Sequence, residues 1–201
     1  MPRRKVANPL ALAVLSCLRQ RPMHPYEMSL TMREQQHDSA VKLNFGSLYA
    51  VVEALAKAGF IVQIAETRQG GRPQRTVYEI TEAGAAELHD WLRELLSEPA
   101  KEYHLLSAGL TFMTALPPTD AAHQLRLRVE RLTEAIEQAR AALHKIRGQS
   151  SKPTVARVFL VEDEYQLALR EAELKYVRRL AQEIADGSID GVADWAAIHS
   201  G

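Results

Sequence analysis

The chain has 201 residues, of which 46% are hydrophobic and 25% are charged, and its formal net charge is zero. This composition is typical of a globular protein with one or two domains, and it excludes a disordered chain and a uniformly basic protein that binds any polyanion. The longest apolar run, near residues 10–18, is about half as long as a membrane-spanning helix. We therefore expect a cytoplasmic protein with no membrane partner.

The zero net charge hides an asymmetry between the two parts of the chain. Residues 1–82 hold 11 basic and 7 acidic side chains, whereas residues 83–201 hold 14 and 18. Contacts with nucleic-acid phosphates require an excess of positive charge. The N-terminal part is therefore the better candidate for a nucleic-acid interface.

A short basic arm precedes the first predicted helix. It carries Arg3, Arg4 and Lys5, and two interpretations stay open: a solvated terminus, or an arm that touches DNA phosphates. The apolar spacing over residues 10–18 predicts a helix whose leucine stripe includes Cys17, the single cysteine. A single cysteine excludes an internal disulfide, and at this position a buried, unreactive thiol is expected.

Two further helices are predicted before residue 60. The second begins at Pro25, which suits a first helical position, and extends to about residue 36 with the apolar residues Met28, Leu30 and Met32. The third covers residues 44–58, because Asn44 is a good N-cap and Gly59 suits a left-handed helix terminator. Its core-facing positions are Leu48, Val51, Val52 and Leu55. Its opposite side is small near the N-terminus, so the helix can approach another surface closely.

A β-hairpin is predicted directly after the third helix. Residues 61–66 and 76–80 are β-prone, and the glycine- and arginine-containing stretch 69–75 separates them. A helix that leads into such a hairpin is the layout of a winged helix-turn-helix. In that fold one helix enters the major groove, and the wing lies on the flanking backbone or minor groove.

A fourth helix is predicted from Thr81, as N-cap, to about residue 96. Its expected buried residues are Trp91, Leu92 and Leu95. Residues 97–99 end this helix and form the best candidate for a domain boundary. The expected division is therefore a winged helix-turn-helix domain over residues 1–98 and a second domain over residues 99–201.

The second domain is predicted to contain long helices. After a helical segment at residues 102–113, apolar residues alternate four and three apart as in a coiled-coil seam: Leu125, Val129, Leu132, Ile136, Ala139, Leu143 and Ile146. A loop at residues 148–153 leads to a last helix over residues 154–186, with apolar residues Val158, Val161, Tyr165, Leu169, Ala172, Tyr176, Leu180 and Ile184. Two long helices with a short connection predict an antiparallel hairpin.

This apolar seam predicts a homodimer, because an exposed seam of this length is an aggregation liability on a monomer. The residues expected in the dimer interface are Leu125, Val129, Leu132, Ile136, Leu143, Tyr165, Leu169 and Tyr176. The predicted fold is thus mainly α with a small β-hairpin: an N-terminal winged helix-turn-helix followed by a C-terminal antiparallel long-helix domain.

Several motifs occur together and in order: Met23-His24-Pro25-Tyr26-Glu27, Gly46-Ser47-Leu48-Tyr49, Gly59-Phe60-Ile61, residues 71–78 and Thr81-Glu82-Ala83-Gly84. In order and spacing they resemble the PadR family of bacterial transcriptional regulators. The C-terminal half resembles the larger PadR subfamily, which carries a helical dimerisation domain. The resemblance implies a homodimeric regulator of double-stranded DNA, more often a repressor, that responds to a ligand or signal. The sequence names no effector.

The residues expected to contact DNA are Lys42, Ser47, Tyr49, Ala50, Lys57, Arg72, Gln74 and Arg75. Ser47 and Ala50 lie in the first turns of the third helix, which enter the major groove first. Tyr49 matches a family tyrosine and either contacts a phosphate or is purely structural. Glu53 and Ala54 stand where the family usually has basic residues, so the wing is expected to contribute more.

Catalytic, metal and cofactor sites are not expected. The seven histidines never lie three or four residues apart, and no Gly-x-Ser-x-Gly motif occurs. Trp91, Tyr103, Phe112 and Phe159 either line an apolar effector pocket or belong to the core. The alternative function, from a different class, is a winged helix that binds another protein without sequence-specific DNA binding. Glu53 on the presumed reading face suits that alternative.

The wing generates a first prediction. Changing Arg72 and Arg75 together to Ala should weaken binding to specific and unrelated duplexes alike, because an arginine reaches a phosphate or a narrow minor groove easily. The slope of log K against log salt, measured by fluorescence anisotropy, should become shallower while the fold is unchanged. An unchanged slope would remove the wing from the interface.

Overall fold

The computed structural model describes residues 4–35, 44–67, 75–99, 101–148 and 155–200. It divides into two compact units, Met1–Lys101 and Glu102–Gly201. Within the described ranges, no helix is long and apolar enough to cross a membrane.

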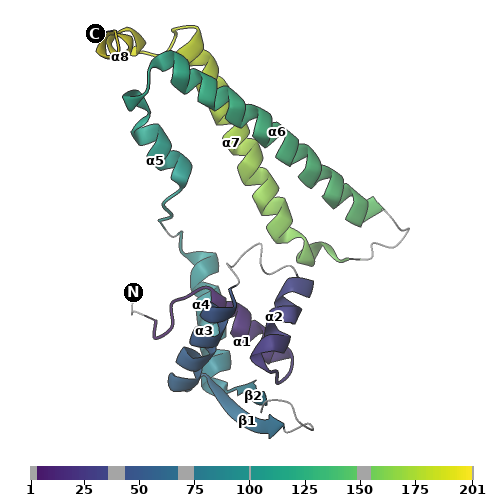
Figure 1. Ribbon diagram of the computed structural model, residues 1–201. Coiled ribbons are helices and arrows are strands. Elements are labelled where there is room, and N and C mark those ends of the chain that lie inside the picture. The colour runs from purple at the N-terminus through teal and green to yellow at the C-terminus, as the bar shows by residue number, and fades with distance from the viewer. Residues whose placement is uncertain (1–3, 36–43, 68–74, 100, 149–154, 201) are drawn as a thin grey trace. The chain divides into compact units, whose positions relative to one another are not determined.

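The N-terminal unit contains four helices and a hairpin within its described residues (Figure 1): α1 (Leu10–Gln20), α2 (Pro25–Glu34), α3 (Phe45–Lys57), β1 (Ile61–Thr67), β2 (Arg75–Ile80) and α4 (Glu82–Ser97). One core joins the four helices; it is built mainly from apolar side chains of α1 and α3, with Met28 and Met32 of α2 and Leu88 and Trp91 of α4. The predicted winged helix-turn-helix is confirmed, because three helices precede an antiparallel two-stranded hairpin.

The predicted ends of α3 are also confirmed. Asn44 caps the helix, with its Oδ1 accepting a hydrogen bond from the Gly46 amide at 2.9 Å. Gly59 follows the helix with φ of +80°, in the left-handed region that favours glycine. Between these residues the predicted side chains Leu48, Val51, Val52 and Leu55 are buried.

A junction between α3 and α4 holds the hairpin in place. Thr81 caps α4 by accepting from the Gly84 amide at 3.0 Å, and its hydroxyl donates to the Gly59 carbonyl at 2.8 Å. The Thr81 amide donates to the Phe60 carbonyl at 3.0 Å. Gly84 lies against that same carbonyl, since a Cβ built on Gly84 would be only 1.9 Å from the Phe60 oxygen. Only glycine therefore allows α4 to start this close to the end of α3.

Three details of this unit were not predicted correctly. Leu92 and Leu95 are exposed, although both were expected on the buried side of α4. On α4 the buried positions are Gly84, Leu88 and Trp91. Gly84 lies against Phe60, whereas Leu88 and Trp91 lie on the line where α4 packs on α1 and the core. A pairing was also missed: Met23 exchanges two backbone hydrogen bonds with Tyr78, which adds a one-residue bridge beside β2.

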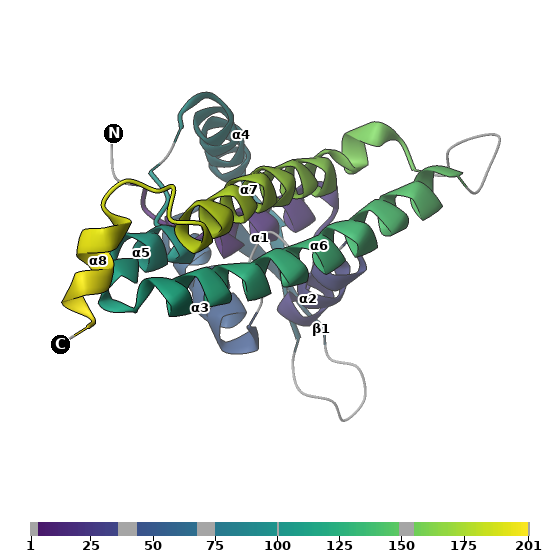
Figure 2. The ribbon, with the colours of Figure 1, turned by 90° about the horizontal axis from the view of Figure 1, so that it is seen from above.

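The C-terminal unit contains a long helical hairpin. Its described elements are α5 (Leu105–Thr111), the 3-10 turn η2 (Met113–Ala115), α6 (Pro118–Gly148), the 3-10 turn η3 (Arg157–Phe159), α7 (Val161–Ala185) and α8 (Val192–Ile198). Both views show α6 and α7 side by side and antiparallel, as predicted (Figures 1 and 2). The predicted helix at residues 102–113 is shorter. The predicted start of the last helix at residue 154 lies outside the described residues.

Helix α8 was not predicted, and it closes the core of this unit. Trp195 is buried among residues of α6 and α7, including Leu125, Val177 and Ile184. Its Nε1 donates to the Leu116 carbonyl at 2.8 Å. The indole therefore ties α8 to the turn that precedes α6.

The junction at Gly84 generates a second prediction. Gly84→Ala should destabilise the N-terminal unit, because overpacking against backbone costs about 1–3 kcal/mol, more than the roughly 1 kcal/mol that Ala gains over Gly in a helix. Gly109→Ala is the matched control, since a Cβ on that helical glycine would meet nothing within 4 Å. Urea unfolding followed by circular dichroism should show a lower midpoint for Gly84→Ala alone. Equal midpoints would contradict the proposed close approach.

Candidate nucleic-acid interface

The outward side of α3 forms a straight line of exposed residues. Gly46, Ala50, Glu53 and Lys57 are exposed and follow one another at spacings of four, three and four, so they lie above one another on the helix. The buried side chains of α3 lie opposite this line. Near the N-terminus the line has no side chain larger than a methyl group, so the helix backbone can come close to a partner there.

Polar and aromatic groups flank this line at the N-terminal end of α3. Ser47 and Tyr49 are exposed. Phe45 is exposed as well, and the Arg33 guanidinium at the end of α2 lies 5.1 Å from the centre of its ring. A cation over an aromatic face is attracted by the negative charge of that face. Arg33 thereby adds a positive charge beside the start of α3.

The predicted DNA contacts divide into two groups. Ser47, Tyr49, Ala50 and Lys57 gather on the exposed surface of α3. Lys42, Arg72 and Gln74 lie outside the described residues. Arg75 begins β2, where its backbone pairs with Thr67, and its side chain lies outside the description.

Arg33 and Phe45 were missed by the sequence analysis. Arg33 was assigned only to the end of a predicted helix, and residues 37–43 separate that helix from Phe45. A contact between two helices across such a connection leaves no periodic signal in one sequence. Exposure of an aromatic residue directly after an N-cap is the only hint that the chain offers.

Arg4 of the basic arm is neither free in solvent nor available to DNA phosphates, the two interpretations that the sequence left open. The Nη1 of Arg4 bonds the Glu87 carboxylate at 2.7 Å, and its Nη2 bonds Glu94. The guanidinium also lies 5.2 Å from the Trp91 ring centre. Arg4 therefore attaches the arm to α4, and its positive charge is paired with two carboxylates of that helix.

Cys17 is buried, as predicted. Burial in the apolar core raises the pKa of its thiol to about 11, because the charged thiolate is poorly solvated there. The thiol is therefore protonated at neutral pH, and a protonated, buried thiol is a poor nucleophile. Among the described residues, no group of histidine, cysteine and carboxylate side chains could hold a metal ion.

An apolar groove of about 570 Å³ lies between α5 and α6. Its lining includes Leu106, Leu110, Met113, Leu125 and Leu132. Arg128 and Arg131 also line it, and the Arg128 guanidinium bonds Glu173 of α7 at 2.6 Å. This groove combines apolar walls with positive charge.

Four aromatic residues were considered for a pocket or the core, and they have different environments. Trp91 belongs to the core of the N-terminal unit. Phe112 lines the apolar groove but is largely exposed, and Tyr103 and Phe159 are exposed. Only Phe112 is therefore placed where it could meet a groove ligand.

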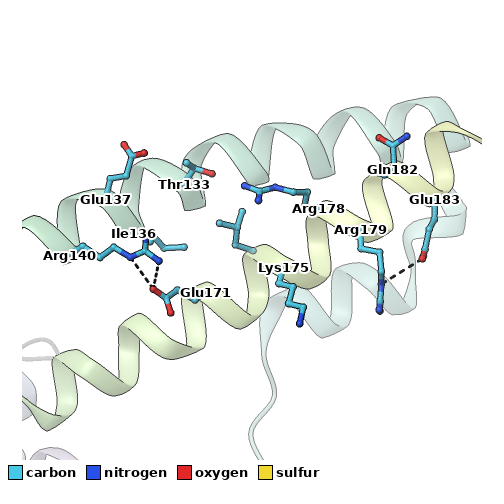
Figure 3. Close-up of a pocket in the computed structure, with 11 residues that line it drawn as sticks. Thr133, Ile136, Glu137, Arg140, Glu171, Lys175, Arg178, Arg179, Gln182 and Glu183 are labelled. Carbon is cyan, nitrogen blue, oxygen red and sulfur yellow. Dashed lines mark hydrogen bonds and ion pairs between the residues drawn. The ribbon is translucent and has the colours of Figure 1, made fainter.

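A second groove, of about 800 Å³, lies between α6 and α7 and is mostly charged (Figure 3). Within it Arg140 bonds Glu171 at 2.7 Å, and the Arg179 Nε lies 3.6 Å from Glu183. The first pair joins α6 to α7, and the second connects successive turns of α7. Paired charges therefore distinguish this groove from the one between α5 and α6.

The two helices of the hairpin use their predicted apolar seams differently. In α6, Leu125, Ile136 and Leu143 are buried, Val129 and Leu132 are half-buried, and Ile146 is exposed. These three buried side chains are thus already covered within one chain. A covered side chain has little surface left for a partner, so the place of these three residues in a dimer interface stays a prediction that the single chain does not favour.

In α7 most of the predicted seam faces away from the core. The buried side chains are Val177, Leu180, Ala181 and Ile184. We define the α7 stripe as the exposed residues Val161, Tyr165, Leu169, Ala172 and Tyr176. They recur four, four, three and four apart, which places them on one face. Only the C-terminal end of the predicted seam, at Leu180 and Ile184, is buried.

Comparison with known proteins fits this arrangement. Residues 14–90 match the family described as "Transcriptional regulator PadR-like family". The chain carries a PadR-like domain. The match covers all of α2, α3 and the hairpin, and most of α1 and α4. It therefore includes the exposed line on α3.

Relatives extend the similarity beyond this domain. The negative transcriptional regulator PadR of Bacillus subtilis (strain 168) is 25% identical over 141 residues, which cover 68% of this chain and 74% of that protein. A crystal structure of B. subtilis PadR in complex with operator DNA superposes with a TM-score of 0.66 at 18% identity, over 87% of this chain and 98% of that one. Its complex with p-coumaric acid gives 0.66 at 17% identity, over 88% and 98%. The fold of both units is therefore that of PadR.

Proposed function

We propose that this chain is a homodimeric, DNA-binding transcriptional regulator that acts as a ligand-responsive repressor. The observation that carries the proposal is the exposed line on α3 within a PadR-like domain. Helix α3 enters the major groove, and residues 69–75 of the wing lie on flanking backbone or in the minor groove. The residues proposed to contact DNA are Lys42, Ser47, Tyr49, Ala50, Lys57, Arg72, Gln74 and Arg75.

The proposed mechanism depends on the distance between the two recognition helices of the dimer. Two recognition helices can occupy successive major grooves only when the dimer holds them about 34 Å apart. A ligand that binds better to a dimer with another spacing must weaken operator binding by the same coupling free energy. Repression would end when such a ligand is bound. No catalytic step is part of this mechanism.

The α7 stripe is the surface that we assign to the dimer. It is apolar, exposed on the single chain and about as long as four helical turns. The half-buried Val129 and Leu132 of α6 keep enough exposed surface to take part. The covered Leu125, Ile136 and Leu143 instead stabilise each hairpin. In this proposal, the buried faces of the two helices stabilise the hairpin, and their exposed faces form the dimer.

An effector is proposed for the apolar groove between α5 and α6. B. subtilis PadR has been crystallised with p-coumaric acid, a small aromatic acid. An acid of that class would meet apolar walls at Leu106 and Leu110 and the positive charge of Arg131. In the groove between α6 and α7, by contrast, most of the lining side chains are charged, and several of them are paired with one another.

The alternative function is a protein-interaction module that keeps the winged helix and does not read DNA. Glu53 favours it, because a carboxylate at the centre of the exposed line repels phosphates. The positive excess of residues 1–82 and the closely approachable start of α3 favour DNA. The next prediction separates the two.

Selection from promoter fragments of the source genome should enrich specific duplexes, and binding to them should weaken steeply with salt. Each phosphate contact contributes about 0.9 to the slope of log K against log salt, so a dimer should give a slope of several units in anisotropy titrations. A protein-only module would enrich no duplex and show no such slope. That result would reject the proposed function.

The α7 stripe generates a prediction on assembly. Tyr165 and Leu169 are 59% and 44% exposed, so changing both to Glu should leave the helical hairpin folded but bury charge in the interface. Light scattering at micromolar concentration should report a monomer, with unchanged circular dichroism. Operator affinity should fall by at least about tenfold, because one half-site is lost.

Arg178→Glu is the matched control, because it makes the same change in net charge on an exposed α7 position that lines the charged groove. It should stay dimeric and bind normally. Changes at Ile136 are unsuitable, because that side chain is only 3% exposed and its replacement would destabilise the hairpin itself. If the Tyr165 and Leu169 variant stays dimeric, another surface must form the dimer.

A further inference from the structure

The exposed line on α3 has one long hydrogen-bonding side chain at its centre. Gly46 has no side chain and Ala50 has only a methyl group, whereas Glu53 projects a carboxylate from the third turn. Lys57 stands one turn further along, near the end of the helix. The side chain that reaches furthest from the middle of this surface is therefore an acceptor, not a donor.

The side chain of Glu53 has few interactions in the described part of the chain. Within the part of the chain that the structure describes, it forms no ion pair, and neither does Lys57 four residues later. Its side chain is exposed and lies opposite the core residues Val51 and Leu55. The carboxylate is thus available to a partner that supplies a hydrogen-bond donor.

Each base pair presents one amino donor on the floor of the major groove, either N4 of cytosine or N6 of adenine. Cytosine presents its N4 amino group there, whereas guanine presents the two acceptors N7 and O6, and thymine presents the acceptor O4. Adenine has an N6 donor, but its N7 acceptor lies beside it and repels a second carboxylate oxygen. Phosphates on both rims repel the carboxylate at every sequence. A carboxylate in this groove is therefore favoured over cytosine and disfavoured elsewhere.

We propose that Glu53 is a specificity-determining residue that selects cytosine in each operator half-site by accepting a hydrogen bond from its N4 amino group. This inference rests on the proposed DNA-binding function. The small side chains at Gly46 and Ala50 let the helix come near enough for a glutamate to reach the base edge. Ala50, one turn before Glu53 on the exposed line, adds no polar group to the line at that point.

Two opposite effects follow from this role. Glu53 strengthens binding to the half-site that has cytosine, and it weakens binding to every other duplex through repulsion from phosphates. Its removal should therefore lower specific affinity and raise non-specific affinity at the same time. A residue that only stabilised α3 would change both affinities in the same direction.

The experiment compares the full-length wild type with Glu53→Ala and Glu53→Gln. Selection from a randomised duplex pool gives the preferred half-site of each protein, and anisotropy titrations at fixed salt give affinities for that site and for an unrelated duplex. Glu98→Ala is the matched control, because it removes one exposed carboxylate at the end of α4, away from α3. Circular dichroism verifies that α3 is intact in each variant.

The wild type should select cytosine at one position per half-site, and replacing that cytosine should reduce affinity about tenfold or more. Glu53→Ala should lose the preference at that position and bind unrelated DNA more tightly. Glu53→Gln should shift the preference toward adenine, because glutamine pairs with N6 and N7 of adenine. The control should match the wild type in both affinities.

Two results would overturn the inference, and they differ from failure of the proposed function. If Glu53→Ala selects the same half-site with the same discrimination as the wild type, Glu53 does not read a base. If specific and non-specific affinities rise together by the same factor, Glu53 acts only through repulsion. Absence of any duplex binding by the wild type would instead remove the DNA-binding function itself, and the inference with it.

Discussion

The contact between Gly84 and the Phe60 carbonyl is the constraint on which the N-terminal unit depends. It brings the start of α4 onto the end of α3, and the bonds from Thr81 to Gly59 and Phe60 lock that approach. The hairpin leaves and returns at this point, since β1 begins at Ile61 and β2 ends at Ile80. The direction in which the strands β1 and β2 leave α3 is thereby set by backbone contacts. Substitutions on the exposed surfaces can then change recognition without changing this geometry.

In the C-terminal unit, the apolar seams that the sequence assigned to one dimer interface divide into a buried part and an exposed part. Leu125 and Ile136 of α6 are covered by their own chain, whereas the α7 stripe is left exposed. Ion pairs at intervals along the hairpin, such as that of Arg140 with Glu171, reinforce the pairing within one chain. An exposed pair of this kind contributes little to stability by itself, so the buried side chains must hold the hairpin. The α7 stripe, which we propose as the dimer surface, therefore has no large part in holding the hairpin together.

The sequence predicted most of this architecture, because the strongest signals were local. Caps at Asn44 and Thr81 and the left-handed Gly59 all depend on a few neighbouring residues. The errors came from packing between elements. Leu95 follows helical periodicity but lies off the line on which α4 meets α1, and the one-residue bridge at Met23 depends on a strand 55 positions later in the chain.

The same distinction applies to the candidate site. The exposed line on α3 follows from the periodicity of that helix and was expected. The role in base selection that we propose for Glu53 was not. The pairing of Arg33 with Phe45 and the attachment of Arg4 to α4 join distant segments. Such contacts are set by how helices cross, which one sequence does not specify. The α7 stripe was recognised as apolar, but which face of α7 meets α6 could be decided only in three dimensions.

The burial of Cys17 has a practical consequence for following this protein in solution. Because the only native thiol is enclosed in the core and stays protonated at neutral pH, reagents that modify thiols should pass over it in the folded state. A cysteine introduced at an exposed position of α3 could therefore carry a spin label or a fluorophore without competing labelling. Two such labels in a dimer would report the separation of the recognition helices directly, with and without a bound ligand.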